Sequence, residues 1–156
     1  MAEALNICSL SPEEAILRAQ EDVNQFAFID VRSEKEFARS HVPGFTNIPI
    51  LNDEFRHMVG LKYHRQGNAE AIKLGHELVQ PHQFTLLSKW GNQIQASILK
   101  QGILTCWRGG LRSRIASEWL SENKCSVLRV EGGYKAMRRL LLQSLDSSPD
   151  CCVLPG

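Results

Sequence analysis

The chain has 156 residues, of which 43% are hydrophobic and 22% are charged, and its formal net charge at pH 7 is +1. The length predicts one globular domain. No apolar run approaches the roughly 18 residues of a membrane span, and the N-terminus does not predict a secretory signal. The small net charge excludes a surface that is basic throughout. However, residues 106–145 carry 8 basic and 3 acidic side chains, so we expect any anion-binding surface in the C-terminal half.

The sequence contains five cysteines, and neither their number nor their spacing suggests a structural role. They are Cys8, Cys106, Cys125, Cys151 and Cys152. An odd number argues against a disulfide framework, and the absence of CxxC and CxxH spacing argues against a zinc site. We therefore predict free or reactive thiols, a reducing cytoplasmic location and no bound metal.

The first half of the chain is predicted to be mostly helical. Capping residues and apolar spacing predict helices at about 12–19, 34–38, 53–59 and 69–79. A short apolar run predicts a buried strand at 26–29, and a short extended piece is expected at 47–50. After Pro81, a further helical period is predicted from Phe84, Leu87, Ile94 and Ile98.

The second half of the chain alternates strands and helices. Strands are predicted at 103–105 and 126–130, and amphipathic helices at 111–120 and 134–141. In the first of these helices Leu111, Ile115, Trp119 and Leu120 are expected to face inward. The alternation predicts an α/β fold, with a mainly parallel central sheet flanked by helices in a single domain.

The segment that connects strand 103–105 to the next helix combines features of a nucleophilic site. Cys106 ends a buried strand, two glycines follow, and a helix begins. Glycines and a helix N-terminus can direct unpaired N–H groups at an anion. These groups, with nearby arginines, lower the pKa of a thiol. We therefore predict Cys106 as the nucleophile, and an anion-binding loop formed by Trp107, Arg108, Gly109, Gly110, Leu111, Arg112 and Ser113.

Several segments resemble rhodanese-like domains. These are Asp-Val-Arg at 30–32, Glu-Phe at 36–37, and His-Val-Pro-Gly-Phe-Thr-Asn-Ile-Pro at 41–49. Three further segments make the resemblance more specific: Leu-Asn-Asp-Glu at 51–54, the Cys-Trp-Arg-Gly-Gly loop at 106–110, and Glu-Gly-Gly-Tyr-Lys at 131–135. Together they resemble the rhodanese domain of the bacterial tRNA 2-selenouridine synthase family over about residues 11–145.

This resemblance implies a specific reaction. Enzymes of that family replace the 2-thio sulfur of the tRNA wobble uridine with selenium from selenophosphate, through an S-geranylated uridine made with geranyl diphosphate. The resemblance implies that Cys106 serves selenium transfer, with selenophosphate as co-substrate and no bound cofactor. The implied partners are tRNA, selenophosphate or a selenium-delivery protein, and a P-loop domain in cis or in trans.

The P-loop domain of that family is not found in this sequence. No G-x-x-x-x-G-K-[ST] motif occurs. We therefore expect a rhodanese-like domain at 1–145 and a linker at 146–156 that leads to the missing P-loop domain.

The spacing within the loop suggests how the reaction is catalysed. Five residues separate Cys106 from Arg112, a C-x5-R arrangement that suits a phosphate-sized anion. We expect the thiolate to attack the selenium of selenophosphate, with Arg112 and the loop amides stabilising the phosphate that leaves. Ser113 could hydrogen-bond the thiolate. Asp30 and Arg32 are expected to support the loop through a salt bridge.

Other functions remain open from the sequence. One is a plain rhodanese sulfurtransferase. The C-x5-R spacing also resembles dual-specificity and Cdc25-like phosphatases, whose thiolate attacks phosphorus, and Asp53 or Glu54 could then supply a proton to the leaving group. A third is a non-catalytic module that docks tRNA or a partner through basic residues, namely Arg108, Arg114, Lys135, Arg138 and Arg139.

Overall fold

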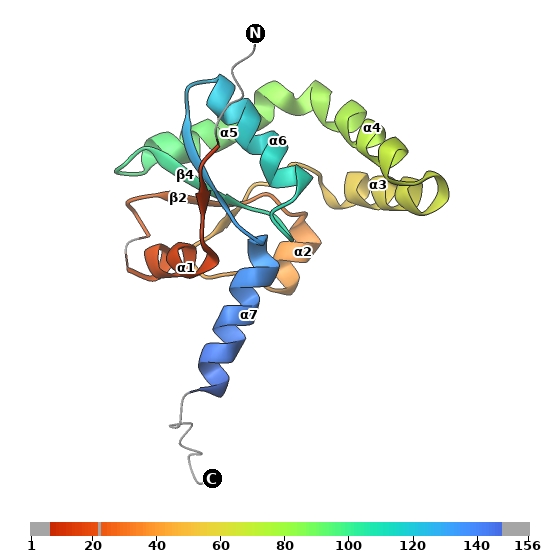
Figure 1. The fold of residues 1–156 in the computed structure, drawn as a ribbon. Helices are drawn as coiled ribbons and strands as arrows, with labels where there is room; N and C mark the ends of the chain where they lie inside the picture. Colours follow the sequence, from red (N-terminus) through yellow and green to blue (C-terminus); the bar gives the residue numbers. More distant parts are fainter. Residues whose placement is uncertain (1–6, 22, 148–156) are drawn as a thin grey trace.

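A computed structural model describes residues 7–21 and 23–147 of the chain, and it contains one five-stranded parallel sheet (Figure 1). The strand order is β1-β5-β4-β2-β3, and every neighbouring pair is parallel. The strands are β1 (Ser9–Leu10), β2 (Ala27–Asp30), β3 (Thr46–Asn47), β4 (Gln101–Thr105) and β5 (Ser126–Val130). The predicted α/β fold with a parallel central sheet is therefore confirmed.

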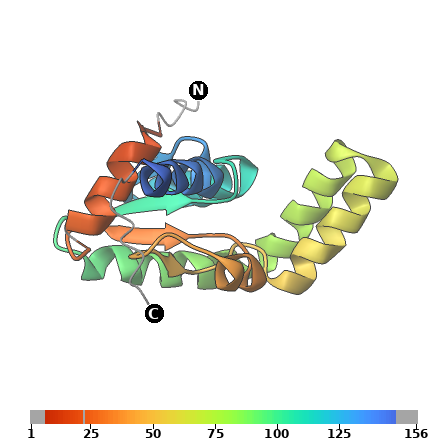
Figure 2. The same cartoon turned by 90° about the horizontal axis from the view of Figure 1, so that it is seen from below.

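Helices cover both faces of this sheet and also extend beyond it. They are α1 (Pro12–Glu21), α2 (Glu34–Arg39), α3 (Asp53–Gln66), α4 (Asn68–Val79), α5 (Gln83–Ala96), α6 (Leu111–Glu122) and α7 (Gly133–Asp146), with a short 3-10 helix, η1 (Gln80–His82), between α4 and α5. Helices α1 and α7 contribute to one apolar cluster, and α5 and α6 to a second. Figure 2 shows α1 and α7 on one side of the sheet and α5 on the other.

The central strands are continuously apolar because both of their faces are covered. All four residues of β2 are buried, as are the last four of β4. In the cluster formed with α1 and α7, Phe28 of β2 and Ile103 of β4 pack with Met137 of α7. In the cluster formed with α5 and α6, Ile29 and Leu104 point to the opposite face, where Trp90 of α5 is fully buried. Because the central strands pack tightly in this core, their ends are held in fixed positions.

Helix α5 presents a different face to the core than the sequence predicted. Phe84 and Ile98 were expected to face inward with Ile94, but their exposed fractions are 83% and 69%. The buried residues of α5 are Leu86, Trp90 and Ile94. The helix ends at Ala96, so Ile98 lies outside it. The inward face of α5 is instead the one that carries Trp90. Leu111, also expected to face inward, is 41% exposed at the first position of α6.

Helices α3 and α4 form an antiparallel pair that projects from one side of the sheet (Figure 2). Asn52 caps α3 as predicted, since its side chain accepts a hydrogen bond of 2.8 Å from the Phe55 amide. The helix continues to Gln66, well past the expected end near residue 59, although it contains no buried residue. No helix in the described ranges is long and apolar enough to cross a bilayer.

Candidate active site

The carboxyl ends of the parallel strands meet at one edge of the sheet, where ligands bind in open α/β folds. Cys106 directly follows β4, and Asp30 is the last residue of β2. Asn47, which ends β3, donates from Nδ2 to the backbone oxygens of Asp30 and Arg32, at 3.1 and 2.9 Å. The loops after β2, β3 and β4 are therefore brought together at this edge.

The turn after β5 holds the Cys106 loop in place. The amide of Tyr134 donates to the carbonyl of Cys106 at 2.8 Å, and the amide of Lys135 donates to that of Trp107 at 2.9 Å. Gly133 has a φ of +61°, and a Cβ at this position would collide with the Cys106 carbonyl oxygen. Glycine is therefore required for the close approach of the two loops.

The loop leaves a continuous run of backbone donors available. Within the described ranges, no backbone N–H from Trp107 to Ser113 donates a hydrogen bond to another group of the chain. The first amide of α6 with an acceptor is that of Arg114, which donates to Gly110. Such unpaired N–H groups at the start of a 12-residue helix favour the binding of an anion.

The Cys106 thiol lies at the base of this loop. Its exposed fraction is 3%, and Sγ donates to Oγ of Ser113 at 3.2 Å. The Ser113 hydroxyl in turn donates to the carbonyl of Gly110 at 3.2 Å. The thiol thus contacts a hydroxyl of α6 instead of lying on an open surface.

A buried ion pair supports the neighbouring loop, as the sequence predicted for Asp30 and Arg32. Both side chains are 1% exposed, and the Arg32 guanidinium contacts the carboxylate at 2.8 to 3.0 Å. Arg32 also donates to the Ser40 carbonyl and lies 3.8 Å from the centroid of the Tyr134 ring. The Tyr134 hydroxyl donates to Oγ of Ser40 at 2.6 Å. The pair therefore joins the end of α2 to the start of α7.

Glu36 is a central acidic residue of the site, and sequence reasoning assigned it no chemical role. Its carboxylate accepts from both terminal nitrogens of Arg112, at 2.7 and 3.2 Å, and pairs with Arg56 at 3.1 Å. Burial opposes its ionisation, but the hydrogen bond and charge of Arg112, the Ser33 amide and the charge of Arg56 together lower the pKa of Glu36 from 4.5 to about 2. Glu36 is therefore a carboxylate at neutral pH.

Arg112 is fixed by the same interaction. Burial alone would lower the pKa of Arg112, but the hydrogen bond and charge of Glu36, with a smaller contribution from Asp30, raise it. Arg112 therefore stays a cation close to the thiol. The pairing links α2 to α6 across 76 residues of sequence, and for this reason no local pattern could reveal it.

Two cavities meet at Arg112 and Arg56. The first, of about 490 Å³, is the basic cavity: it is lined by Arg32, Glu36, Arg39, Ser40, Arg56, Trp107, Arg112 and Arg138. The second, of about 650 Å³, lies between the α3–α4 pair and the start of α6, and residues such as Leu51, Val59, Ile72 and Ile115 give it an apolar wall. Trp107 and Arg112 of the Cys106 loop line the basic cavity, Leu111 and Arg112 line the apolar one, and Cys106 itself lines neither.

Some predicted residues lie away from this site. Asp53 and Glu54 line neither cavity, and the Asp53 carboxylate accepts from the amide of Lys35 at the start of α2. Arg114 pairs with Glu118 on the exposed surface of α6. Cys8, Cys106 and Cys125 form no disulfide, whereas Cys151 and Cys152 lie outside the described residues, as does most of the predicted linker. No group of three or more His, Cys, Asp or Glu side chains in residues 7–21 and 23–147 could bind a metal ion.

Comparison with known proteins identifies the family. The rhodanese-like domain model matches residues 11–140. The chain belongs to the rhodanese-like family. It is 44% identical over 127 residues to the tRNA 2-selenouridine synthase of Sulfurovum sp. (strain NBC37-1), and 42% identical over 122 residues to that of Hydrogenovibrio crunogenus. These matches cover 81% and 78% of this chain but 34% and 33% of the relatives, so the chain spans about a third of their length.

Solved structures agree with this rhodanese-like assignment. The N-terminal domain of a "putative ATP/GTP binding protein" from Clostridium difficile 630 matches with a TM-score of 0.75 and 28% identity, covering 86% of this chain and 98% of that chain. A rhodanese-related protein from Thermoplasma volcanium matches with a TM-score of 0.50 and 17% identity, covering 85% of this chain and 92% of that chain. The second similarity shows the fold alone.

Proposed function

We propose that this rhodanese-like chain is a selenium transferase domain that acts in the conversion of wobble 2-thiouridine to 2-selenouridine in tRNA, with Cys106 as nucleophile and selenophosphate as co-substrate. The observation that carries the proposal is the Cys106 loop itself. It combines a thiol at a strand end, amides from Trp107 to Ser113 that are unpaired within the described residues, and Arg112, which Glu36 holds in place. The relatives named tRNA 2-selenouridine synthase support the choice of reaction.

The electron balance determines which atom the thiolate attacks. Attack on selenium, which the sequence suggested, would leave the bonding electron pair on phosphorus and release phosphite rather than phosphate. Attack on phosphorus involves no oxidation or reduction when the reactant is hydrogen selenophosphate with its proton on selenium. A Cys106 S–P bond forms, the P–Se bond breaks, and selenium leaves with the bonding electron pair and its own proton as HSe⁻. Water then hydrolyses the S–P bond, returning the thiol and releasing phosphate. We propose attack on phosphorus.

The residues around the thiol suit this step. We expect the amides of the loop and Arg112, which also pairs with Glu36, to stabilise the charge that develops on the phosphoryl oxygens. The released HSe⁻ can add to C2 of the uridine and expel sulfur as hydrosulfide, or as a thiolate if that sulfur has been alkylated. This exchange conserves atoms and charge and needs no redox cofactor.

The acid–base groups of the site favour selenophosphate over ordinary phosphate esters. An alkoxide or phenoxide leaving group needs a proton from a nearby acid, as in general acid catalysis. Glu36 is the carboxyl group that lines the basic cavity, and its pKa of about 2 keeps it ionised at neutral pH. Asp53 and Glu54, either of which could have supplied that proton in the phosphatase alternative, do not line that cavity. Selenium that already carries the proton of hydrogen selenophosphate leaves as HSe⁻, which is a weak enough base to need no further proton from the protein.

The proposal can be tested with the purified chain. It would be incubated separately with selenophosphate, thiosulfate and an aryl phosphate, and phosphorus products would be followed by ³¹P NMR. We expect selenophosphate to yield phosphate, Cys106→Ala to abolish this turnover, and Cys125→Ala to retain it as the control for a free cysteine elsewhere. Phosphite would indicate attack on selenium. Turnover of thiosulfate alone would instead support a sulfurtransferase, and rapid hydrolysis of the aryl phosphate would support a phosphatase.

A further inference from the structure

The basic cavity beside the Cys106 loop contains more positive charge than one small anion requires. Five arginines line it, with a single carboxylate, Glu36. Arg112 and Arg56 share that carboxylate, and Arg32 is paired with Asp30 behind the cavity wall. The remaining two, Arg39 and Arg138, form no ion pair within the described ranges. Their charges are therefore available to a ligand.

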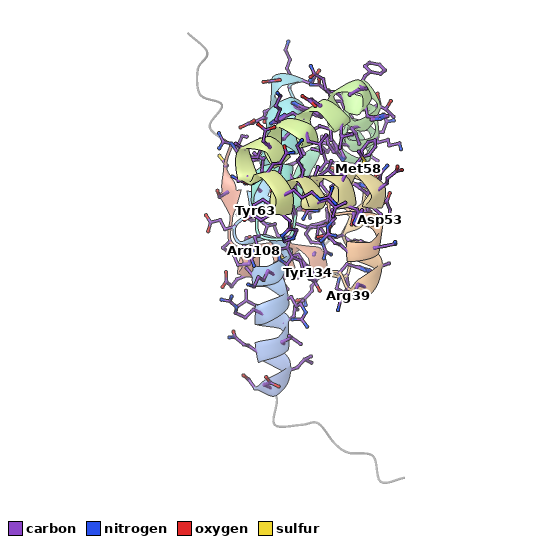
Figure 3. All side chains as sticks on the ribbon, turned by 90° about the vertical axis from the view of Figure 1, so that its right-hand side faces the viewer. Arg39, Asp53, Met58, Tyr63, Arg108 and Tyr134 are labelled. Atoms are coloured by element: carbon purple, nitrogen blue, oxygen red, sulfur yellow. The ribbon has the colours of Figure 1, made fainter. Side chains whose placement is uncertain are left out.

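These two arginines lie on different elements around the cavity. Arg39 is the last residue of α2, and Arg138 lies in the second turn of α7. Both side chains are exposed. Figure 3 shows Arg39, Tyr134 and Arg108 on the same side of the molecule, below helix α3. Charges distributed in this way fit an extended polyanion, whereas a single phosphate is already served by the loop amides and Arg112.

The same cavity has an aromatic wall. Trp107 lines it with 37% of its surface exposed, and its ring centroid lies 5.7 Å from that of Tyr134, which packs behind it. A partly exposed aromatic ring between arginines is the arrangement on which unpaired bases stack in single-stranded RNA complexes. Trp107 directly follows Cys106 in the chain, whereas the buried thiol itself does not line the cavity.

We propose that the basic cavity binds a single-stranded RNA segment, with phosphodiester groups on Arg39 and Arg138 and one base stacked on Trp107. The choice of RNA rests on the proposed function, since the substrate is a tRNA base. The concave shape does not suit a flat membrane surface. An acidic peptide would satisfy the arginines but would leave the exposed tryptophan without a stacking partner.

The test measures RNA binding by the full chain without selenophosphate. A fluorescein-labelled RNA hairpin with a single-stranded loop would be titrated by fluorescence anisotropy at several salt concentrations. The variants are Arg39→Ala, Arg138→Ala and Trp107→Ala. Arg139→Ala is the matched control, because it removes the same charge from the neighbouring position of α7, which does not line the cavity.

The expected results are specific to these positions. Arg39→Ala and Arg138→Ala should each reduce the slope of log K against log salt by about 0.7, the value for one phosphate contact on a single strand. Trp107→Ala should weaken binding roughly tenfold, and Trp107→Phe should restore most of it. Arg139→Ala should change neither affinity nor slope. Circular dichroism spectra of all variants would verify that they are folded.

Several results would overturn the proposal. They are equal effects of Arg138→Ala and Arg139→Ala, unchanged binding in Trp107→Ala, absence of RNA binding by the wild-type chain, and equally strong displacement of the RNA by polyglutamate. Inorganic phosphate at matched ionic strength should not displace the RNA, and displacement would identify the cavity as a site for small anions. Since the assay contains no selenophosphate, a failure of the selenium chemistry with intact RNA binding would refute only the proposed function.

Discussion

Replacing Glu36 with glutamine should change how the stability of the fold depends on pH. The carboxylate is 12% exposed and joins α2 to α6 and α3 through Arg112 and Arg56. A pKa lowered from 4.5 to about 2 corresponds to about 3 kcal/mol of folding free energy, at about 1.4 kcal/mol for each pH unit. Because Arg56 is 53% exposed, solvent screens part of this interaction, and we expect about 2 to 3 kcal/mol.

The direction in which pH changes the stability follows from the lowering of the Glu36 pKa in the folded state. A carboxyl group with a lower pKa in the folded state stabilises the fold fully above its unfolded value near 4.5, and this stabilisation is lost as the pH falls towards 2. The wild-type chain should therefore be more stable than Glu36→Gln by about 2 to 3 kcal/mol at pH 7, with the difference approaching zero near pH 2.

Urea unfolding followed by circular dichroism, at pH values from 2 to 7, would measure this difference. Glu118→Gln is the control, because Glu118 pairs with Arg114 on an exposed helix surface. That substitution should cost less than about 0.5 kcal/mol at any pH. A Glu36→Gln penalty that is constant from pH 7 to pH 2, or one no larger than that of Glu118→Gln, would refute the reasoning.

Three further substitutions test other parts of the structure. Asp30→Asn should destabilise the fold by roughly 3 to 5 kcal/mol in urea unfolding, since it leaves Arg32 buried without a counter-charge; a loss below about 1 kcal/mol would contradict the buried pairing. Gly133→Ala should lower the melting temperature and displace the Cys106 loop. The control Gly60→Ala lies in open space on α3 and should be neutral or stabilising by up to about 1 kcal/mol. Equal melting temperatures of the two variants would argue against the close approach of Gly133 to the Cys106 carbonyl. Trp90→Phe should cost about 1 to 3 kcal/mol by calorimetry, because it removes a buried hydrogen bond and core volume.

The sequence predicted the central strands and the position of Cys106 because their signals are local. Strand β5 was predicted with its observed bounds, and the capping box of α2, formed by Ser33 and Glu36, has the expected helix start. The end of α3 could not be predicted, since no residue of that helix is buried and no apolar period marks its length. Strand β1 was missed because a two-residue strand carries no pattern of its own.

The candidate site likewise has features that the local sequence predicts and features that it does not. The loop from Trp107 to Ser113 follows from glycines and a helix start that are adjacent in the chain. By contrast, the shared carboxylate of Glu36 and the stacking of Arg32 on Tyr134 join segments that are far apart in sequence. Contacts of that kind depend on tertiary packing, and a single sequence shows which side chains could form them but not which ones do.

The projecting α3–α4 pair has a consequence for how stability is distributed over the molecule. Helix α3 reaches the core only through partly buried side chains such as Phe55 and Val59, whereas α5 buries Trp90 and Ile94 completely. Partial opening of the pair therefore exposes little apolar surface and needs less free energy than global unfolding. Amide hydrogens of α3 should exchange with deuterium well before those of β4. Opening of α3 would uncover the apolar cavity beneath it while the sheet that carries Cys106 stays intact.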